Sequence, residues 1–450
     1  MIINIIKGYK TYLSAYNITV KVNKNSFFTD RAVKIDNNKK MIYNLIGVNA
    51  MLIRDNYLNQ LIAGKDLNLI KVITGVRRSG KSTLLLQYKD YLINEKIKEE
   101  NIIYMNFESA QWYDIKDYKD LYNYIVNFNK SNDKKYILLD EVQNVDKWEK
   151  AVNSLLVDID CDIYITGSNA YLLSSELTTL LAGRVLTVKI YPFSFSEFIK
   201  EYPFMNDEDK YEKFDKYLKY GGMPMLVNMK DDEQLIMNYL NDIKEVVLKK
   251  DVINRNNIKD TVFLDNLIKY MASVIGNLTT PYSIAEFMKK NGSSITNETV
   301  DAYLKMLENA YFIYRVPRYE LKGKQLLKTQ GKYYFVDNGL KNIISGISSY
   351  DSDSSYENLI YIELLRRGYE VYVGQYNDIE IDFIAIKPNE RIYYQVSRSI
   401  MDEKVEEREK RSLLSINDNY KKVILTMDNV RNKQIEGIEV VNIIDFLLGK

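Results

Sequence analysis

The stretch Leu69-Ile-Lys-Val-Ile-Thr-Gly-Val-Arg-Arg-Ser-Gly-Lys-Ser-Thr83 decides how the first half of this chain folds. An apolar run with the pattern of a buried strand leads into Gly75-x-x-x-x-Gly80-Lys81-Ser82, and a segment with the pattern of a helix follows. Glycines in such a loop let successive backbone N–H groups turn toward phosphate oxygens, and the helix presents its positive N-terminal end to them. The stretch predicts a phosphate-binding P-loop made of Gly75, Val76, Arg77, Arg78, Ser79, Gly80, Lys81, Ser82 and Thr83.

The polar side chains of this loop have different expected roles. We expect Lys81 to reach the β and γ phosphates of a nucleoside triphosphate. Ser82 would place its hydroxyl on the Mg²⁺ that bridges them, and Thr83 begins the helix. Arg77 and Arg78 occupy positions whose side chains usually point away from the phosphates, so we expect them to bind a neighbouring domain or a partner's acid. A glycine-containing turn without a ligand is the alternative, and the flanking strand and helix disfavour it.

A second motif ends the apolar run Tyr136-Ile-Leu-Leu-Asp140-Glu141. A buried central strand of a parallel sheet carries its functional groups at the carboxyl end, which is where these two acids stand. The run predicts a Walker B motif in which Asp140 holds Mg²⁺ through water or through Ser82. Glu141 would orient and polarise the attacking water. An acidic strand end without a catalytic role is the alternative.

Two more residues are candidates for the same site. Asn169 follows the apolar run that ends in Gly167-Ser168, and it is a candidate sensor of the γ-phosphate or of water. Gly-Ser-Asn also suits any turn at a strand exit, so that alternative stays open. Arg184 stands at the start of another expected strand, where it is a candidate arginine finger within the chain or across a subunit contact.

Expected strands and helices alternate through this part of the chain. The expected strands cover residues 69–74, 101–107, 136–140, 161–166 and 185–190. Apolar strands that alternate with helices are typical of a parallel sheet with helices on both faces. The predicted fold class is therefore α/β, with the parallel sheet of a P-loop NTPase.

Composition limits the chemistry available to this chain. Its 450 residues contain no histidine and one cysteine, Cys161. This excludes Ser-His-Asp and Cys-His catalysis, histidine-ligated zinc and internal disulfides, so any metal is expected to be a hard, oxygen-ligated ion. The net charge of +1 gives no global attraction to nucleic acid, and no run is long enough for a membrane span. A cytoplasmic setting without a membrane partner is the simplest expectation.

The first 50 residues differ from the rest. They are basic, with eight Lys or Arg, rich in asparagine, and without clear helical or strand periodicity. Met51 then opens a segment with the pattern of a natural start. We expect residues 1–50 to be a weakly packed extension, and an over-extended reading frame is one explanation for them.

Five motifs together resemble a prokaryotic AAA-like P-loop ATPase family of unknown function. The resemblance covers the chain from about residue 51 to its end. It implies ATP binding and hydrolysis, with the P-loop and Walker B residues in their usual roles, and a C-terminal domain that looks like a PD-(D/E)xK nuclease. The motifs are Gly75 to Thr83, Leu139-Asp-Glu-Val-Gln-Asn-Val145 with Trp148-Glu149, Gly167-Ser-Asn169, Gly183-Arg184 and Tyr191-Pro-Phe-Ser-Phe-Ser-Glu-Phe198.

The middle of the chain has the pattern of a winged-helix module. Three short helices over 263–275, 283–291 and 296–309 precede two strands over 311–319 and 331–336. The third helix would enter a DNA major groove in a DNA-binding module, but it is acidic, with Glu298, Asp301 and Glu308 against Lys305. Packing against protein is therefore favoured. Four lysines on the expected wing keep DNA open as a partner: Lys322, Lys324, Lys328 and Lys332.

The C-terminal segment follows the order of a nuclease-like core, with a helix at 356–367, strands at 369–373, 379–386 and 392–397, a helix at 402–414 and a strand at 422–426. Nucleases of this type hold Mg²⁺ with a helical Glu, a strand Asp and a (D/E)xK strand. The first two positions are matched by Glu357 or Glu363 and by Asp382, which follows Glu380. The third position reads Gln395-Val396-Ser397, so a degenerate, binding-only domain is favoured. An active nuclease would need Lys387 or Arg398 as a substitute.

The predicted domains are an extension at 1–50, an AAA-like ATPase domain with a helical lid at 51–255, a winged-helix module at 256–338 and a nuclease-like domain at 339–450. The leading hypothesis is an Mg²⁺-dependent ATPase whose nucleotide state controls how the C-terminal domains engage a DNA or protein partner. The alternatives are a slow-turnover ATP-binding scaffold and an ATP-coupled DNA nuclease, and a homo-oligomer is open in each case. A GTPase is disfavoured because no Asn-Lys-x-Asp motif follows the Walker B.

Overall fold

The computed structural model describes residues 52–128, 133–170, 180–181, 183–201, 210–229, 232–323, 325–347, 350–430 and 433–449. Residues 52–450 form one compact unit. The predicted extension at 1–50 and Met51 lie outside the described residues.

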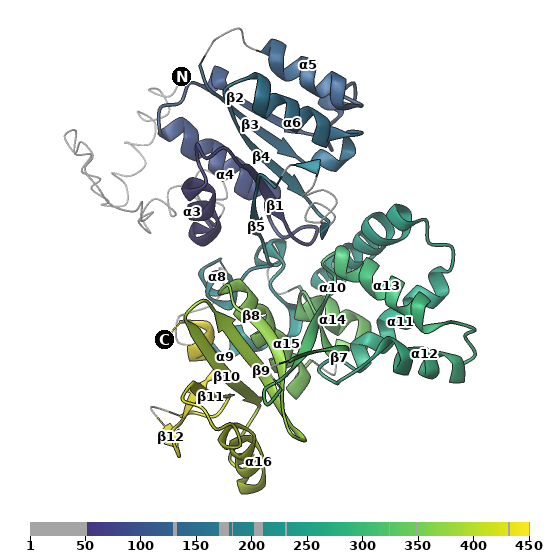
Figure 1. The fold of residues 1–450 in the computed structure, drawn as a ribbon, viewed down its shortest axis with the longest axis vertical. Helices are drawn as coiled ribbons and strands as arrows, with labels where there is room; N and C mark the ends of the chain where they lie inside the picture. Colours follow the sequence, from purple (N-terminus) through teal and green to yellow (C-terminus); the bar gives the residue numbers. More distant parts are fainter. Residues whose placement is uncertain are drawn as a thin grey trace, which may run out of the picture. The chain divides into compact units, whose positions relative to one another are not determined.

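A five-stranded parallel sheet opens the described chain (Figure 1). The strand order is β2-β3-β4-β1-β5, and every neighbouring pair is parallel. The strands are β1 Ile70–Thr74, β2 Ile102–Asn106, β3 Lys135–Asp140, β4 Cys161–Gly167 and β5 Val185–Lys189. This confirms the five predicted strands and the parallel α/β arrangement of the first half.

Helices cover both faces of this sheet, as Figure 1 shows. Ile70 and Val72 of β1 pack in one core with α5 and α6, whereas Ile73 packs in a second core with α3 and α4. Successive strand residues point to opposite faces, so an uninterrupted apolar run buries both of them. The helices are α3 Asp55–Ala63, α4 Lys81–Asn94, α5 Tyr118–Phe128 and α6 Trp148–Asp158.

A helical region follows β5. Several of its helices begin where a side chain accepts the hydrogen bond of a backbone N–H in the first turn, as Asp260 and Thr296 do for α11 and α13. The three helices predicted for the middle of the chain are confirmed as α11, α12 and α13. The elements are α8 Phe195–Glu201, α9 Lys210–Tyr220, α10 Glu233–Val246, a π-helical segment Val247–Asn254, α11 Thr261–Ser273, α12 Pro281–Lys290 and α13 Asn297–Asn309.

An eight-stranded mixed sheet occupies the C-terminal part, in the order β12-β13-β11-β10-β9-β8-β6-β7. Helices α15 and α16 pack on its strands, and apolar residues from β9 and β10 belong to two separate cores. The strands are β6 Ile313–Glu320, β7 Gln325–Phe335, β8 Glu370–Tyr376, β9 Ile379–Lys387, β10 Glu390–Ser397, β11 Lys421–Thr426, β12 Lys433–Ile435 and β13 Ile438–Asn442. The helices are α14 Asn338–Ser345, α15 Asp353–Arg366, α16 Glu403–Leu414 and α17 Ile443–Leu447.

The hairpin expected as a wing is part of this sheet. β6 and β7 pair antiparallel, and Arg318–Glu320 of β6 then pairs in parallel with Val373–Gln375 of β8. The predicted domain boundary between residues 338 and 339 falls inside this sheet. It separates β6 and β7 from the other strands of the same sheet. Of the wing lysines, Lys324 and the side chain of Lys328 lie outside the described part, and Lys332 is buried.

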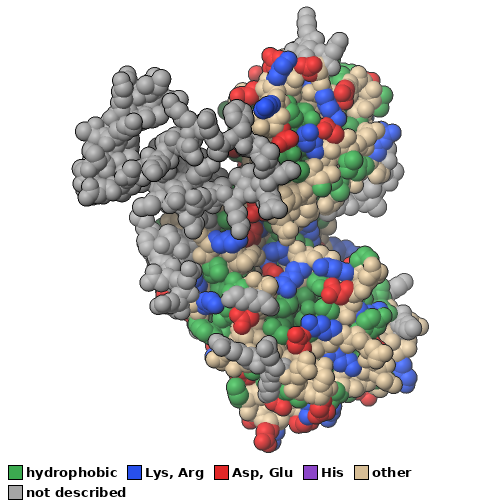
Figure 2. All heavy atoms as spheres, turned by 90° about the vertical axis from the view of Figure 1, so that its left-hand side faces the viewer, with side chains coloured by type: hydrophobic (Ala, Val, Ile, Leu, Met, Phe, Trp, Pro, Cys, Tyr) green, Lys and Arg blue, Asp and Glu red, His purple; other side chains and the backbone are tan. Residues whose placement is uncertain are grey.

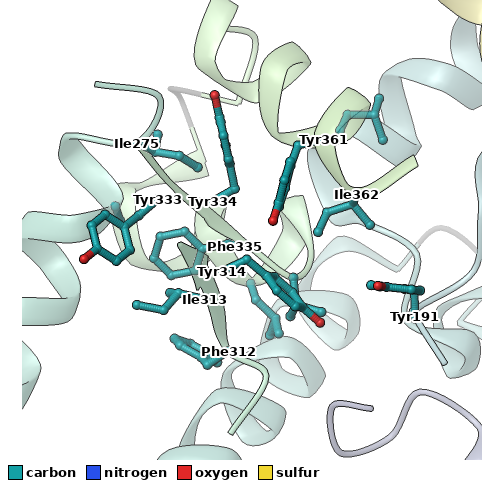
Figure 3. Close-up of a cluster of buried hydrophobic side chains, with 14 of the residues drawn as sticks. Tyr191, Ile275, Phe312, Ile313, Tyr314, Tyr333, Tyr334, Phe335, Tyr361 and Ile362 are labelled. Carbon is teal, nitrogen blue, oxygen red and sulfur yellow. The ribbon is translucent and has the colours of Figure 1, made fainter. Parts of the chain in front are cut away.

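One apolar core joins the helical region to the C-terminal sheet (Figure 3). Tyr334 of β7 stacks on Tyr361 of α15 with ring centroids 4.9 Å apart, and Phe335 meets Phe312 edge to face at 5.6 Å. The same core includes Val76 of the P-loop, which is fully buried. The loop that contains the predicted nucleotide site therefore contributes to the same apolar core as the C-terminal sheet.

The visible surface carries both signs of charge. Figure 2 shows Lys and Arg side chains interspersed with Asp and Glu over this face, as the net charge of +1 leads one to expect. Among the residues that the structure describes, none of the helices has the length and apolar character needed to cross a bilayer.

Replacing Phe335 by alanine should lower the free energy of unfolding by about 3–5 kcal/mol, because the truncation leaves a cavity in the shared core. Urea denaturation followed by far-UV circular dichroism measures this change. Leu326→Ala is the matched control, since Leu326 lies on the same strand and is 52% exposed. Equal losses in the two variants would contradict the assigned core.

Candidate functional site

The P-loop leaves β1 through two glycines that other residues could not replace. A Cβ on Gly75 would lie 2.2 Å from the carbonyl oxygen of Ile190, which follows β5. Gly80 has a φ of 99°, in the left-handed region that favours glycine, and α4 begins at the next residue. The loop therefore turns between β1 and the N-terminus of α4, as the sequence predicts.

Lys81 lies beneath this loop. It is 4% exposed, and its Nζ donates to the carbonyl oxygens of Gly75 and Val76, both at 3.1 Å. Burial lowers the pKa of this ammonium, while nearby Glu141 opposes the shift. Ser79 contributes a buried hydroxyl oxygen with no hydrogen-bond partner in the described residues. A buried cation bonded to neutral carbonyls, next to an unsatisfied hydroxyl, suits an anionic ligand such as a triphosphate.

The Walker B acids are held by a residue of the neighbouring strand. Thr166 of β4 donates its hydroxyl proton to Oδ1 of Asp140, and the Thr166 hydroxyl oxygen accepts the backbone N–H of Glu141 at 2.9 Å. Tyr104 of β2 donates to Oδ2 of Asp140 at 3.3 Å. Thr166 and Tyr104 were not predicted as site residues. The position of Thr166 near the carboxyl end of β4 could have indicated it, whereas Tyr104 lies in the middle of β2.

Glu141 has an unusual backbone conformation. Its φ of 55° and ψ of 47° lie in the left-handed region, which non-glycine residues seldom adopt and which costs about 1–3 kcal/mol. The side chain is 6% exposed, and Oε2 accepts a hydrogen bond from Nε2 of Gln143. The carboxylate expected to act on water is therefore engaged by a neighbouring amide.

Oxygen ligands suited to Mg²⁺ come from the residues that the sequence indicates. Ser82 lies in the first turn of α4, and Asp140 ends β3. A hydroxyl and a carboxylate are hard oxygen donors of the kind that Mg²⁺ takes from proteins in nucleotide sites, together with water and phosphate oxygens. These two residues fit the ion and would hold it.

The side chains at the front of the loop point away from the expected phosphates. Val76 is in the apolar core and Arg78 is exposed, with a φ of 68°. Arg77 forms ion pairs with Asp251 of the π-helical segment and with Glu108 after β2, both at 3.0 Å. Arg77 was expected to bind a neighbouring domain or a partner's acid, whereas the two acids that it contacts lie within the predicted ATPase domain 51–255. Its partner Asp251 was not predicted, since 174 residues separate the two in the sequence.

A buried arginine supports the loop from behind. Arg54 is 4% exposed, and its guanidinium donates to the carbonyl oxygens of Ser79 at 3.1 Å and Tyr191 at 2.9 Å. Two further bonds, at 2.8 and 2.9 Å, go to the carboxylate of Glu197. Arg54 therefore ties the P-loop to the Tyr191–Phe198 motif. No sequence pattern indicated Arg54, because it stands in no local motif.

The structure places the two weaker candidates, Asn169 and Arg184, at opposite edges of the sheet. Asn169 is buried just after β4, where Gly167 pairs with Thr74 beside the P-loop. Arg184 precedes β5, and its carbonyl accepts the N–H of Ile70 at the opposite end of β1. Five residues of strand, roughly 16 Å at the usual rise, lie between that end and the P-loop. A role for Arg184 as a finger on the nucleotide of its own chain is therefore wrong, because the parallel strands put it at the other edge of the sheet.

A second group of polar residues lies on the C-terminal sheet. Lys332 of β7 is 2% exposed, and its Nζ contacts three carboxylates: Glu380 at 2.8 Å, Glu357 at 3.2 Å and Asp382 at 3.4 Å. Tyr334 donates its hydroxyl proton to Glu357 at 2.7 Å. These acids hold Lys332 strongly protonated and keep its pKa well above its ordinary range, against the cost of burial. The lysine assigned to a DNA-facing wing is instead the counter-ion of this carboxylate cluster.

The remaining nuclease candidates divide between this cluster and other contacts. Oε1 of Gln395 accepts the backbone N–H of Asp382, and Nε2 donates to Glu409 of α16, both at 2.7 Å. Glu363 instead pairs with Arg366 and Arg367. Neither proposed substitute cation reaches the cluster: Lys387 lies over the ring of Tyr369, and Arg398 pairs with Asp351. Among the described residues, no group of three or more acids or cysteines is arranged to hold a metal ion.

Comparisons with known proteins match both halves of the chain. Residues 67–199 match a family described as an AAA domain, and residues 211–351 match a domain of unknown function, DUF8612. The chain is 43% identical over 401 residues to an uncharacterized protein of Haemophilus influenzae, covering 89% of this chain and 99% of that protein. It is 30% identical over 399 residues to an uncharacterized protein of Methanocaldococcus jannaschii, covering 84% and 85%.

A solved structure of a Walker-type ATPase from Pyrococcus abyssi also resembles this chain, with a TM-score of 0.46 and 16% identity. The likeness covers 65% of this chain and 96% of that one. The family match over residues 67–199 gives this chain an AAA domain, whereas the comparisons do not show a nuclease-like C-terminal domain.

Titration of Glu357 should make the stability of the fold depend on pH. Burial and nearby Asp382 raise the pKa of Glu357 from 4.5 to about 7, although Lys332 and Tyr334 oppose the shift. Because the pKa of Glu357 is higher in the folded than in the unfolded state, protonation of this group stabilises the fold. The stabilisation is fully present below pH 4.5 and is lost as the pH rises to about 7. Urea denaturation at intervals from pH 4.5 to 8 should show a shallower pH dependence for Glu357→Gln than for the wild type.

The matched control is Glu403→Gln, which changes an exposed glutamate at the start of α16. Its pH dependence should parallel that of the wild type. Parallel curves for Glu357→Gln as well would contradict the raised pKa.

Proposed function

Because the chain belongs to the family of the 43% identical Haemophilus influenzae protein and carries an AAA domain over residues 67–199, we propose that it is an Mg²⁺-dependent ATPase. Its nucleotide state would control how the C-terminal part engages a macromolecular partner. The observation that carries this proposal is the geometry of the P-loop. Buried Lys81 donates hydrogen bonds to two neutral carbonyl oxygens of the loop, and the Ser79 hydroxyl lacks a partner among the described residues.

The geometry supports a defined division of labour in ATP binding. Backbone N–H groups of the loop and the N-terminus of α4 would face the phosphates. Lys81 would exchange its two carbonyl acceptors for phosphate oxygens, which form stronger, charge-assisted hydrogen bonds. Ser82 and Asp140 would hold Mg²⁺, which neutralises charge on the phosphate oxygens when it is bound.

Hydrolysis would depend on Glu141. Thr166 holds the backbone of this residue at the carboxyl edge of the sheet, beside Asp140. A carboxylate at that point can accept a hydrogen bond from water and aim its oxygen at the γ-phosphate. Asn169 is proposed to sense the γ-phosphate or the water from the end of β4, where it is buried. Arg184 could serve as a finger only toward a second copy of the chain.

A slow-turnover switch is the second candidate, and one contact favours it. The amide of Gln143 engages the carboxylate of Glu141. A catalytic carboxylate that already accepts a hydrogen bond must release it before it binds water productively. ATP would then be bound for long periods, and the chain would act as a nucleotide-dependent scaffold until a partner displaces Gln143.

The described contacts weigh against the DNA nuclease. Lys332 places its ammonium among Glu357, Glu380 and Asp382, where a metal-dependent nuclease would need free carboxylate oxygens. The acids of α13 and the burial of Lys332 also weaken DNA as the partner, so we favour a protein.

Two substitutions separate binding from hydrolysis. Lys81→Ala should abolish detectable ATP binding, because no other cation replaces its contact with the β and γ phosphates. Glu141→Gln should keep ATP affinity within about threefold and lower kcat by about 100-fold, since the amide orients water but accepts no proton. Binding of a fluorescent ATP analogue and steady-state phosphate release measure the two effects.

Lys98→Ala serves as the matched control, because Lys98 is 65% exposed on the described surface. It should bind and hydrolyse ATP like the wild type. Unchanged ATP binding by Lys81→Ala would sink the proposal. A wild-type kcat that Glu141→Gln leaves unchanged would instead remove Glu141 from the mechanism.

A further inference from the structure

A forked ion pair connects the P-loop to the helical region. Nε and Nη2 of Arg77 donate to the two carboxylate oxygens of Asp251 at 3.0 and 3.2 Å. Asp251 is 2% exposed, and its Oδ1 also accepts the hydroxyl proton of Ser168 at 3.1 Å. A planar guanidinium with two hydrogen bonds to one carboxylate fixes orientation as well as distance. The carboxylate therefore follows the position of the loop closely.

Both groups that hold Asp251 belong to the edge of the sheet where the nucleotide is expected. Arg77 is the third residue of the P-loop, and Ser168 directly precedes the candidate sensor Asn169. Loss of Arg77 would leave the charge of this buried carboxylate uncompensated at a large cost, and loss of Ser168 would remove one of its hydrogen bonds. The pair is therefore expected to persist while the loop closes around phosphates, so that movement of the loop reaches Asp251.

Asp251 lies on a helical segment whose hydrogen bonding is unusual. The segment Val247–Asn254 is π-helical and continues α10 without a break. Runs of this kind are rare, usually single turns, and frequent at functional sites. A change between π-helical and α-helical hydrogen bonding rotates every residue that follows, which here includes α11 and the helices packed on it. A small displacement of Asp251 would act directly on the hydrogen bonds of this segment.

We propose that Arg77 and Asp251 are positioning residues that couple nucleotide in the P-loop to the conformation of the π-helical segment Val247–Asn254. The inference rests on the proposed ATP binding and supplies the route by which nucleotide state reaches the C-terminal part. Arg77 acts through the loop backbone, and Asp251 acts through Arg77. The coupling is reciprocal, so a partner that holds one arrangement of the segment changes ATP affinity by the same factor.

Hydrogen–deuterium exchange on the full chain tests this coupling, with and without Mg²⁺ and a non-hydrolysable ATP analogue. In the wild type, the analogue should slow amide exchange by about threefold or more in residues 75–83 and also in 247–254. Asp251→Asn keeps the shape of the side chain and removes its charge. In this variant the analogue should still slow exchange in 75–83, while exchange in 247–254 should no longer respond.

The split between kcat and KM distinguishes lost positioning of the loop from a general loss of packing. Asp251→Asn should lower kcat by about tenfold with KM within about threefold of the wild type, because the nucleotide still binds but the loop is less well positioned. Arg77→Lys keeps the charge and loses the fork, so it should show an intermediate kcat and can replace Asp251→Asn if that variant does not fold. Glu233→Gln is the matched control, since Glu233 begins α10, pairs with Lys219 and is 57% exposed. It should behave as the wild type in both measurements.

The outcomes separate this inference from the ATPase proposal. Protection of 75–83 in the wild type without any response in 247–254 would overturn the coupling and leave ATP binding intact. A response in 247–254 that persists in Asp251→Asn and in Arg77→Lys would equally overturn it. No response in either region, together with no binding of the fluorescent ATP analogue, would count against ATP binding itself.

Discussion

The nucleotide site depends on one constraint: the turn from Thr74 to Lys81 must satisfy packing partners on several sides at once. Gly75 passes so close to Ile190 that it has no room for a side chain, and Arg54 holds the carbonyl of Ser79. Val76 is fixed in the apolar core, and the next residue along binds a buried acid. A loop held at so many points is shaped before a ligand arrives, so little conformational entropy remains to be lost on binding.

The same contacts explain why the chain does not divide cleanly after the ATPase sheet. The core that contains Val76 runs through the helical region into β6 and β7, and these strands belong to the C-terminal sheet. Lys332 on β7 then neutralises acids on β9 and α15. The hairpin is thus both a packing element and the source of the counter-ion in the carboxylate cluster. The carboxylate cluster of the C-terminal sheet is therefore charge-compensated by a lysine of the same sheet.

Sequence patterns predicted the features whose causes are local. The P-loop, the Walker B acids and the five parallel strands follow from apolar runs and from glycines at fixed spacing, and each was found where expected. What could not be predicted depends on pairing across long separations. A hairpin next to three helices has the pattern of a wing until β8 is known to pair with it, and Asp251 shows no motif that links it to Arg77. Arg184 was misplaced for a related reason, because the first residue of a parallel strand lies at the edge opposite the P-loop.

The contacts of Lys81 and Glu141 place binding and hydrolysis under different controls. Lys81 donates to neutral carbonyls, and burial without a direct acidic contact lowers its pKa, so phosphate oxygens would stabilise its charge better than its present partners do. ATP binding would therefore gain free energy at this ammonium. Glu141 is different, since its strained backbone and its bond to Gln143 hold the carboxylate in one position before water arrives. Under the proposed function, the choice between rapid turnover and long-lived bound ATP would depend on Gln143 and on what moves it, and the P-loop alone would not determine it.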